Sequence, residues 1–272
     1  HPTMRHLLTI IALLFSMVCA AQCPTTNTAF KSGEHLEYDL YFNWKFIWFK
    51  VGSAEMDIKQ VDYKGTPAYK AYLITRGSKT ADRYFVMRDT LTSYVSKDLV
   101  PLYYVKAAFE GKSYRKDEVS YTYTSQGTHV DMSYKKNERP TAHQSIDIPD
   151  CAYDMISMLL KARSFDGSKF KKGDCIEFLM ADGKDCTLQK IIFRGKKNFT
   201  NEHTDEKYRC LVFSFVEVEG NKEKEIVTFY ITDDANHLPV RLDLNLRFGS
   251  AKAFLINAKG VRNPQTSLIK KK

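Results

Sequence analysis

The chain has 272 residues, of which 43% are hydrophobic and 27% charged, and its formal charge at pH 7 is +9. This composition is typical of a globular protein and excludes disordered, collagen-like and multi-span membrane proteins. A net positive charge suits contact with anionic envelope polymers or lipid headgroups, although a basic soluble surface is the simpler explanation. Without a recognition motif, we expect no nucleic-acid partner.

Residues 1–21 predict an export signal. A basic residue, Arg5, is followed by an apolar run over 7–18 and then by small residues up to Ala21. This order is typical of a secretory signal peptide that is cleaved after Ala21. We expect residues 1–3, which precede the first methionine, to lie outside the fold.

Two forms of membrane attachment are the alternatives to a cleaved signal. A spanning helix needs ~20 apolar residues, and the run over 7–21 is shorter than this. A lipid anchor needs a small residue just before the modified cysteine, whereas Cys19 follows valine and Cys23 follows glutamine. No other segment is apolar enough to cross a bilayer as a helix, so the mature chain is expected to have no transmembrane span.

The segment from Leu36 to Ile58 has an apolar or small residue at every second position, the period of a half-buried β-strand. As one strand it would measure about 75 Å, whereas a compact domain of this size is about 45 Å across. We therefore expect the chain to turn within 43–45 or at Gly52. Residues 41–50, YFNWKFIWFK, hold six aromatic residues, and both faces of the strand are apolar there.

Short alternating runs separated by turn residues continue along the chain and predict a mainly β fold, a curved antiparallel sheet that forms a half-barrel or barrel. We expect one domain over 22–272, which could comprise two β halves joined near 136–165. The predicted strands are Tyr84–Val95, Tyr103–Phe109, Glu118–Tyr123, His129–Tyr134, Ile176–Met180, Thr187–Phe193, Leu211–Val218, Ile226–Thr232, Val240–Phe248 and Ala253–Ala258.

Residues 151–163 predict the one principal helix, and its apolar stripe is wide enough to plug or flank the sheet. Asp150 is the expected N-cap, and Asp154 lies at the favourable end of the helix dipole. The polar segment 135–145, which contains a proline, is expected to be an exposed connection. The stripe consists of Ala152, Met155, Ile156, Leu159 and Leu160.

Export predicts an oxidising compartment in which disulfides form. The chain has six cysteines, and removal of Cys19 with the signal leaves an odd number, none in a CxxC or zinc-type spacing. At least one is therefore free or pairs outside the chain. One or two structural disulfides, rather than a redox or metal role, are expected among Cys151, Cys175, Cys186 and Cys210.

Several short motifs, in their order and spacing, resemble one family. They are Gly33-Glu34-His35-Leu36-Glu37-Tyr38, Val51-Gly52-Ser53-Ala54, Arg88-Asp89 with Ser93-Tyr94, the helix after Pro149, Thr232-Asp233-Asp234, Leu238-Pro239-Val240 and Phe248-Gly249. From about Phe30 to Ala258 the chain resembles the exported bacterial family known as domain of unknown function 3108. The resemblance implies a periplasmic or envelope location and a curved β-rich fold, and it supplies no activity or catalytic residues. The pair Trp48-Phe49 departs from the family pattern, which has smaller residues at this place.

No sequence motif for catalysis or metal binding emerges. The chain lacks a G-x-S-x-G elbow, and Cys151 at the helix start, the best-placed nucleophile, reads more simply as a disulfide or buried thiol. Asp233, Asp234 and Asn236 resemble the start of a calcium loop, but Leu238 stands where an EF-hand requires glycine, so a hairpin turn is expected. Acids on the predicted strands that could pair for glycan hydrolysis are Glu55, Asp57, Glu118 and Asp131, although alternation places most acids on a solvated face.

The signal peptide predicts export, and the family resemblance implies the periplasm or outer membrane of a Gram-negative bacterium. We expect no catalytic centre, metal or cofactor in the protein. The first hypothesis is that it binds a lipid or another amphiphile along an apolar groove, although the same aromatic residues would serve a filled core. The second is an envelope protein that docks on another protein through a strand edge or aromatic patch, and the third is a hydrolase of cell-wall or dietary glycans. The residues predicted to line the groove are Trp44, Phe46, Ile47, Trp48 and Phe49.

Overall fold

The computed structural model describes residues 23–246 and 249–269, and it describes Trp44 without its side chain. The predicted signal peptide lies outside these residues. Within them, one sheet of fifteen strands runs in the order β8-β7-β6-β5-β4-β3-β2-β1-β15-β14-β13-β12-β11-β10-β9. The elements are β1 (Glu34–Trp44), β2 (Ile47–Tyr63), β3 (Thr66–Gly77), η1 (Ala81–Arg83), β4 (Met87–Ser96), β5 (Pro101–Glu110), β6 (Ser113–Thr124), β7 (Gly127–Lys136), β8 (Ala142–Ile148), β9 (Ala152–Tyr153), α2 (Met155–Ala162), η2 (Gly167–Lys169), β10 (Cys175–Ala181), β11 (Cys186–Asn201), β12 (Glu206–Glu219), β13 (Lys222–Thr232), β14 (Pro239–Leu246) and β15 (Gly249–Lys259).

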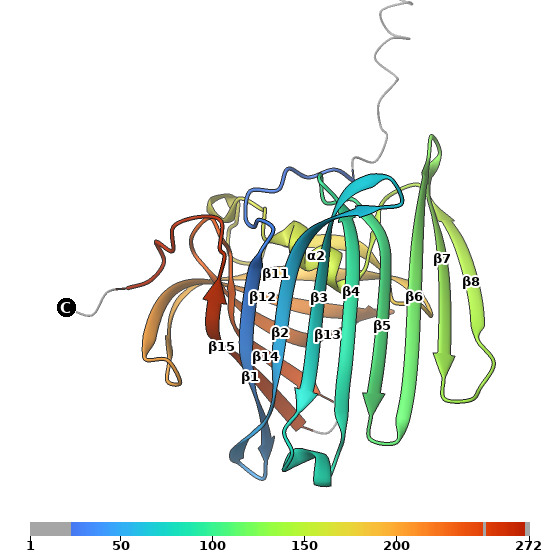
Figure 1. Ribbon diagram of the computed structural model, residues 1–272. Coiled ribbons are helices and arrows are strands. Elements are labelled where there is room, and N and C mark those ends of the chain that lie inside the picture. The colour runs from blue at the N-terminus through green and yellow to red at the C-terminus, as the bar shows by residue number, and fades with distance from the viewer. Residues whose placement is uncertain (1–22, 247–248, 270–272) are drawn as a thin grey trace, which may run out of the picture.

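The sheet curves into a barrel that is nearly closed, which confirms the mainly β, barrel-like prediction. Strands β1 to β8 form a curved wall, β11 to β14 cross behind it, and α2 lies inside (Figure 1). The last strands of the order, β8 and β9, are joined by residues 149–151. The β10–β11 turn packs closely against β6 on the opposite wall. A Cβ added to Gly183 in this turn would lie 2.6 Å from the Cβ of Asp117.

Strands β1 and β2 arise from the alternating segment, and the predicted turn is confirmed one residue further on. Leu36 pairs with Met56, and both point into the core, as the alternation predicts. The chain reverses at Lys45 and Phe46. At Gly52 the strand continues, and glycine is needed there since a Cβ would lie 2.1 Å from the backbone oxygen of Arg76.

The principal helix is confirmed but begins at Met155, later than predicted. Ala152 and Tyr153 instead pair with β10 as β9, so Asp154 rather than Asp150 is the N-cap. Its Oδ1 accepts the backbone N–H groups of Ile156 at 3.0 Å and Ser157 at 2.8 Å, and the Ser157 hydroxyl completes a capping box. None of the described helices is long and apolar enough to traverse a bilayer.

The segment 135–145 is not an exposed connection throughout. Residues up to Lys136 complete β7, and residues from Ala142 onward form the edge strand β8. Most side chains of β8 are exposed, which explains why this strand reads as a polar loop in the sequence.

Asp154 makes the stability of the fold depend on pH. Burial raises the pKa of Asp154 from its usual value of 3.8 to about 6, although hydrogen bonds from Ser157 and Ser93 lower it. Between about pH 6 and pH 4 the folded state therefore binds a proton that the unfolded chain does not yet bind, so the contribution of this group to stability rises as the pH falls.

The variant Asp154→Asn tests this dependence because it keeps an oxygen that can cap the helix but removes the titration. We expect the unfolding free energy of the native chain, measured in urea relative to that of the variant, to increase from pH 7 to pH 4. A constant difference, or one that decreases toward acid pH, would contradict the raised pKa.

Candidate functional site

An apolar cavity lies inside the barrel, between α2 and strands β10 to β13. Its volume is about 150 Å³, which matches an engineered protein cavity that stays dry and binds benzene. From the helix and the segment after it come Met155, Met158, Leu159, Ala162, Phe165 and Phe170. From the sheet come Phe178, Met180, Ile191, Phe213, Phe215, Val227 and Phe229.

Helix α2 lies between this cavity and the main core, and it presents an apolar face to each of them. Ile156 and Leu160, one turn apart, are buried in the main core. The cavity face has a spacing of three, four and seven residues from its first member, as one helical stripe requires. Its members are Met155, Met158, Leu159 and Ala162. The predicted single stripe thus combined members of two faces.

Phenylalanine rings form much of the cavity wall. Phe193 and Phe213 lie on neighbouring strands with ring centroids 5.1 Å apart, and Phe170 from the segment after η2 approaches Phe213 edge to face at 5.5 Å. Across β12 and β13, Phe213 is paired with Phe229. Aromatic pairs at these distances stabilise one another beyond their burial, so the wall is well defined.

Two polar side chains reach the cavity wall, and most of their hydrogen-bonding groups are already used. Arg163 donates to both carboxylate oxygens of Glu34, at 2.5 and 2.9 Å, and to the backbone oxygen of Asn236. The Nδ1 atom of His237 lies 2.6 Å from the backbone oxygen of Arg163, and it must donate because a carbonyl oxygen only accepts. Of these groups, only the Nε2 atom of His237 has no hydrogen bond to the protein among the described residues. The rest of the cavity wall offers apolar contacts.

The residues predicted to bind a ligand lie away from this cavity, on the β1–β2 hairpin. Phe46 is 97% exposed, and Ile47, Trp48 and Phe49 are exposed beside it. The alternation that begins at Leu36 places Phe46 and Trp48 on the inward face, and this expectation is wrong, because both side chains are exposed at the hairpin. The side chain of Trp44 lies outside the described residues.

The sequence pattern does not identify the cavity phenylalanines as one group, because alternation describes each strand by itself. Six phenylalanines that line the cavity lie between residues 165 and 229, on predicted strands and in the loop after the helix. Alternation gives the face on which each lies, but it does not reveal that several strands turn this face toward one helix. The concentration of phenylalanine in this part of the sequence was the available signal.

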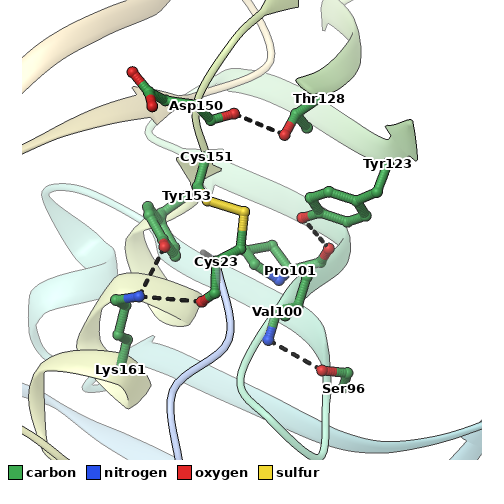
Figure 2. The surroundings of a disulfide bond; sticks show 10 residues. All are labelled: Cys23, Ser96, Val100, Pro101, Tyr123, Thr128, Asp150, Cys151, Tyr153 and Lys161. Atoms are coloured by element: carbon green, nitrogen blue, oxygen red, sulfur yellow. Dashed lines mark hydrogen bonds between the residues drawn. A yellow bond between two sulfur atoms is a disulfide. The ribbon is translucent and has the colours of Figure 1, made fainter. Parts of the chain in front are cut away.

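The structure corrects the predicted disulfides. Cys151 pairs with Cys23, with a Cα–Cα distance of 5.6 Å, and Cys175, Cys186 and Cys210 are free. The pairing expected among Cys151 and the three later cysteines is wrong. The sulfur of Cys151 is also bonded to Cys23, so it is not a nucleophile in this state. The Nζ atom of Lys161 donates to the backbone oxygen of Cys23 at 3.2 Å, which adds a contact between the N-terminal segment and α2 (Figure 2).

The acids considered for glycan hydrolysis lie on solvated surfaces. Glu118 and Asp131 line a polar cleft of about 250 Å³ on the wall formed by β5 to β8. The hydroxyl of Tyr103 donates to Glu118 and lowers the pKa of Glu118, whereas a proton donor for hydrolysis needs a raised pKa. Asp57 instead pairs with His35 at 3.0 Å.

The predicted turn over Asp233, Asp234 and Asn236 is confirmed, and β14 begins after it at Pro239. Asp234 accepts from the backbone N–H of Asn236 at 3.0 Å and from the hydroxyl of Ser267 at 2.6 Å. Its oxygens therefore hold the turn and the C-terminal segment. Over residues 23–246 and 249–269, no group of three or more His, Cys, Asp or Glu side chains is placed to hold a metal ion.

Comparison with known proteins extends over most of the chain. The family described as "Protein of unknown function (DUF3108)" matches residues 37–256. Among solved structures, the chain is similar to the crystal structure of a beta-barrel-like protein of domain of unknown function DUF1849 from Brucella abortus. The TM-score is 0.57 and the identity 9%, over 86% of this chain and 100% of that one, so the similarity concerns the fold alone. No curated protein matches the chain.

Proposed function

The chain belongs to the DUF3108 family of proteins of unknown function, and we propose that it is an exported, non-enzymatic protein that holds the apolar part of a lipid or another amphiphile. The binding site is the cavity between α2 and strands β10 to β13. The observation that carries this proposal is a cavity of about 150 Å³ walled by phenylalanine, methionine and aliphatic side chains.

The chemistry of the wall supports an apolar guest. Transfer of apolar surface from water into such a cavity is favourable by ~25 cal/mol per Å², and an apolar cavity of this size is left empty by water. A charged group would lose its hydration without gaining a partner, because Arg163 is already paired with Glu34. The guest is therefore an acyl chain segment or a small ring, and any charged headgroup stays outside.

Met155 supports an opening at the first turn of α2. This residue lines the cavity and is also 52% exposed, so the cavity wall continues to the molecular surface there. Methionine is unbranched and adapts to guests of different shape. We infer that an amphiphile enters beside Met155 with its apolar end first.

Export to the periplasm or outer membrane of a Gram-negative bacterium is part of the same proposal. The predicted signal over residues 1–21 supports it, and the disulfide between Cys23 and Cys151 suits an oxidising compartment. The guest is then an envelope component. Native mass spectrometry of protein purified from its own periplasm would identify it as an extra mass that organic extraction removes.

Filling the cavity is expected to abolish binding. In Ala162→Phe the new ring occupies the space of the guest, so we expect the affinity for a fluorescent apolar probe such as N-phenylnaphthylamine to fall at least tenfold. The cost in stability is about 1–3 kcal/mol for an overpacked site, which thermal unfolding would measure.

The matched control is Ala107→Phe, which introduces the same ring at a half-buried alanine on β5 away from the cavity. It should bind the probe as the native chain does. Equal binding by both variants would place the probe elsewhere, and the absence of both probe binding and a copurified molecule would overturn the proposed function.

A further inference from the structure

Three neighbouring loops lie side by side at one end of the wall made by β1 to β8. Because consecutive strands are antiparallel, the β1–β2, β3–β4 and β5–β6 connections all point the same way, toward the bottom of Figure 1. We call residues 45–50, 78–86 and 109–114 the hairpin rim. The β7–β8 connection, residues 137–141, also lies at this end, beyond β6, whereas the connections at residues 64–65, 97–100 and 125–126 lie at the opposite end of this wall.

The parts of the hairpin rim are held side by side. The backbone N–H of Ser78 donates to the oxygen of Val51 at 2.7 Å, which attaches the β3–β4 loop to β2. The backbone N–H of Gly111 donates to the oxygen of Val86 at 2.7 Å, and a Cβ at Gly111 would lie 3.0 Å from the Phe85 ring. The loops therefore present a continuous surface.

Large apolar side chains are exposed on the hairpin rim and scarce at the opposite end. Tyr84 is 88% exposed, close to the value for Phe46. The opposite connections, all of which are described, contain no exposed large apolar side chain, and only Tyr123 lies beside them at 36%. The exposed apolar residues of the rim are Phe46, Ile47, Trp48, Phe49, Tyr84, Phe85, Phe109 and Tyr114.

The tip of the β1–β2 hairpin has a backbone that its residues do not favour. Lys45 has φ 46° and Phe46 has φ 72°, so both residues of the turn are left-handed. Asn-Gly is the pair that suits such a turn, and a bulky residue at positive φ is strained. Because the Phe46 side chain is almost fully exposed, packing within the chain does not offset this strain. Residues with a strained backbone cluster at binding and other functional sites.

Basic side chains surround the aromatic residues. Of the two acids in the rim, Asp82 binds Arg88 at 2.5 Å and Glu110 is close to the carboxylate of Asp89. Lys50 is paired with Asp39. Among the residues that the structure describes, no ion-pair partner is found for Lys45, Lys79, Arg83 and Lys112.

We propose that the hairpin rim docks on the surface of an anionic lipid bilayer. Phe46, Tyr84 and Phe85 enter the headgroup region, where aromatic side chains are favoured, and the four unpaired basic residues contact lipid phosphates. Protein interfaces are depleted of lysine, whereas basic residues beside exposed aromatic residues are typical of membrane-surface segments. This site is separate from the cavity and does not depend on it.

The two tryptophans give a readout that is specific for this surface. Both tryptophans of the chain, Trp44 and Trp48, lie on the β1–β2 hairpin, so tryptophan emission reports on this hairpin alone. With vesicles that contain 30% phosphatidylglycerol in phosphatidylcholine, we expect a blue shift and quenching by brominated acyl chains. Vesicles of phosphatidylcholine alone should give a weak response, and added salt should weaken the binding.

Substitutions separate docking from folding. In Phe46→Gly the backbone angle suits glycine, so we expect thermal stability to stay equal or rise while vesicle affinity falls about tenfold. Lys79→Gln with Lys112→Gln should lower the affinity about 30-fold, from ~1 kcal/mol for each basic residue. The matched control replaces two lysines of the opposite end, Lys64→Gln with Lys97→Gln, and should remain within about twofold of the native chain.

Three results would overturn the proposal. The first is vesicle binding without a change in tryptophan emission, which would assign the contact to another part of the chain. The second is equal weakening by the rim and control substitutions. The third is the absence of binding to anionic vesicles, which would leave a protein partner as the occupant of this surface.

Discussion

Replacing Arg163 by methionine is expected to lower the free energy of unfolding by about 3–5 kcal/mol, because a buried carboxylate loses its partner. Arg163 and Glu34 have side chains that are 2% and 1% exposed. The guanidinium group also donates to the backbone oxygen of Asn236 and lies over the Phe30 ring, with 5.5 Å to the centroid. This pair thus joins the start of β1, the end of α2 and the β13–β14 loop.

Urea unfolding of Arg163→Met, of Glu34→Leu and of the double variant would test this expectation. Since the cost arises from the charge that is left alone, the double variant should be more stable than the sum of the two losses predicts. Additive losses would show that the side chains do not interact. Ala107→Met, a substitution at a half-buried position on β5, controls for insertion of a methionine at a site without ion pairs.

Removal of the disulfide through Cys23→Ser with Cys151→Ser is expected to lower the free energy of unfolding by about 2–5 kcal/mol. The bridge links residues 128 positions apart and holds the N-terminal segment against the barrel (Figure 2). Constraining such a long loop reduces the entropy of the unfolded chain, and in the folded state the bridge fixes the segment that precedes β9.

The same difference should appear when the native chain is unfolded with and without a reducing agent. Cys175→Ser is the matched control, because Cys175 is free and exposed and its replacement should change stability by less than about 0.5 kcal/mol. A reductant that leaves the unfolding midpoint unchanged would contradict the stabilising role of the bridge.

Local patterns predicted the strands because one buried face leaves its period in the sequence. Leu36 and Met56 alternate with polar residues, and both point into the core. The alternation does not show where the buried part of the sheet ends. Phe46 continues the same period, but its side chain lies beyond the barrel and is exposed. Burial depends on neighbours that a single strand does not encode.

Contacts between distant segments could not be predicted in this way. The pairing of Cys23 with Cys151 depends on how the N-terminal segment passes the start of β9, and cysteine spacing does not contain this information. The cavity requires a gap between α2 and strands β10 to β13, and the width of this gap depends on how the whole sheet curves. The two faces of α2 appeared as one stripe because a helix with apolar residues on both faces has no polar side to mark the boundary.

The central place of β1 in the sheet has a consequence for the order of folding. Strand β1 pairs with β2 on one side and with β15 on the other, so that His35 lies opposite Lys259. The hairpins from β1 to β8 can form from segments that are close in sequence. The pairing of β1 with β15, in contrast, needs a strand from the far end of the chain. Closing such a long loop is slow. Until β15 arrives, the free edge of β1 is able to pair with other chains, so we expect a late, cooperative closing step that a chaperone would protect.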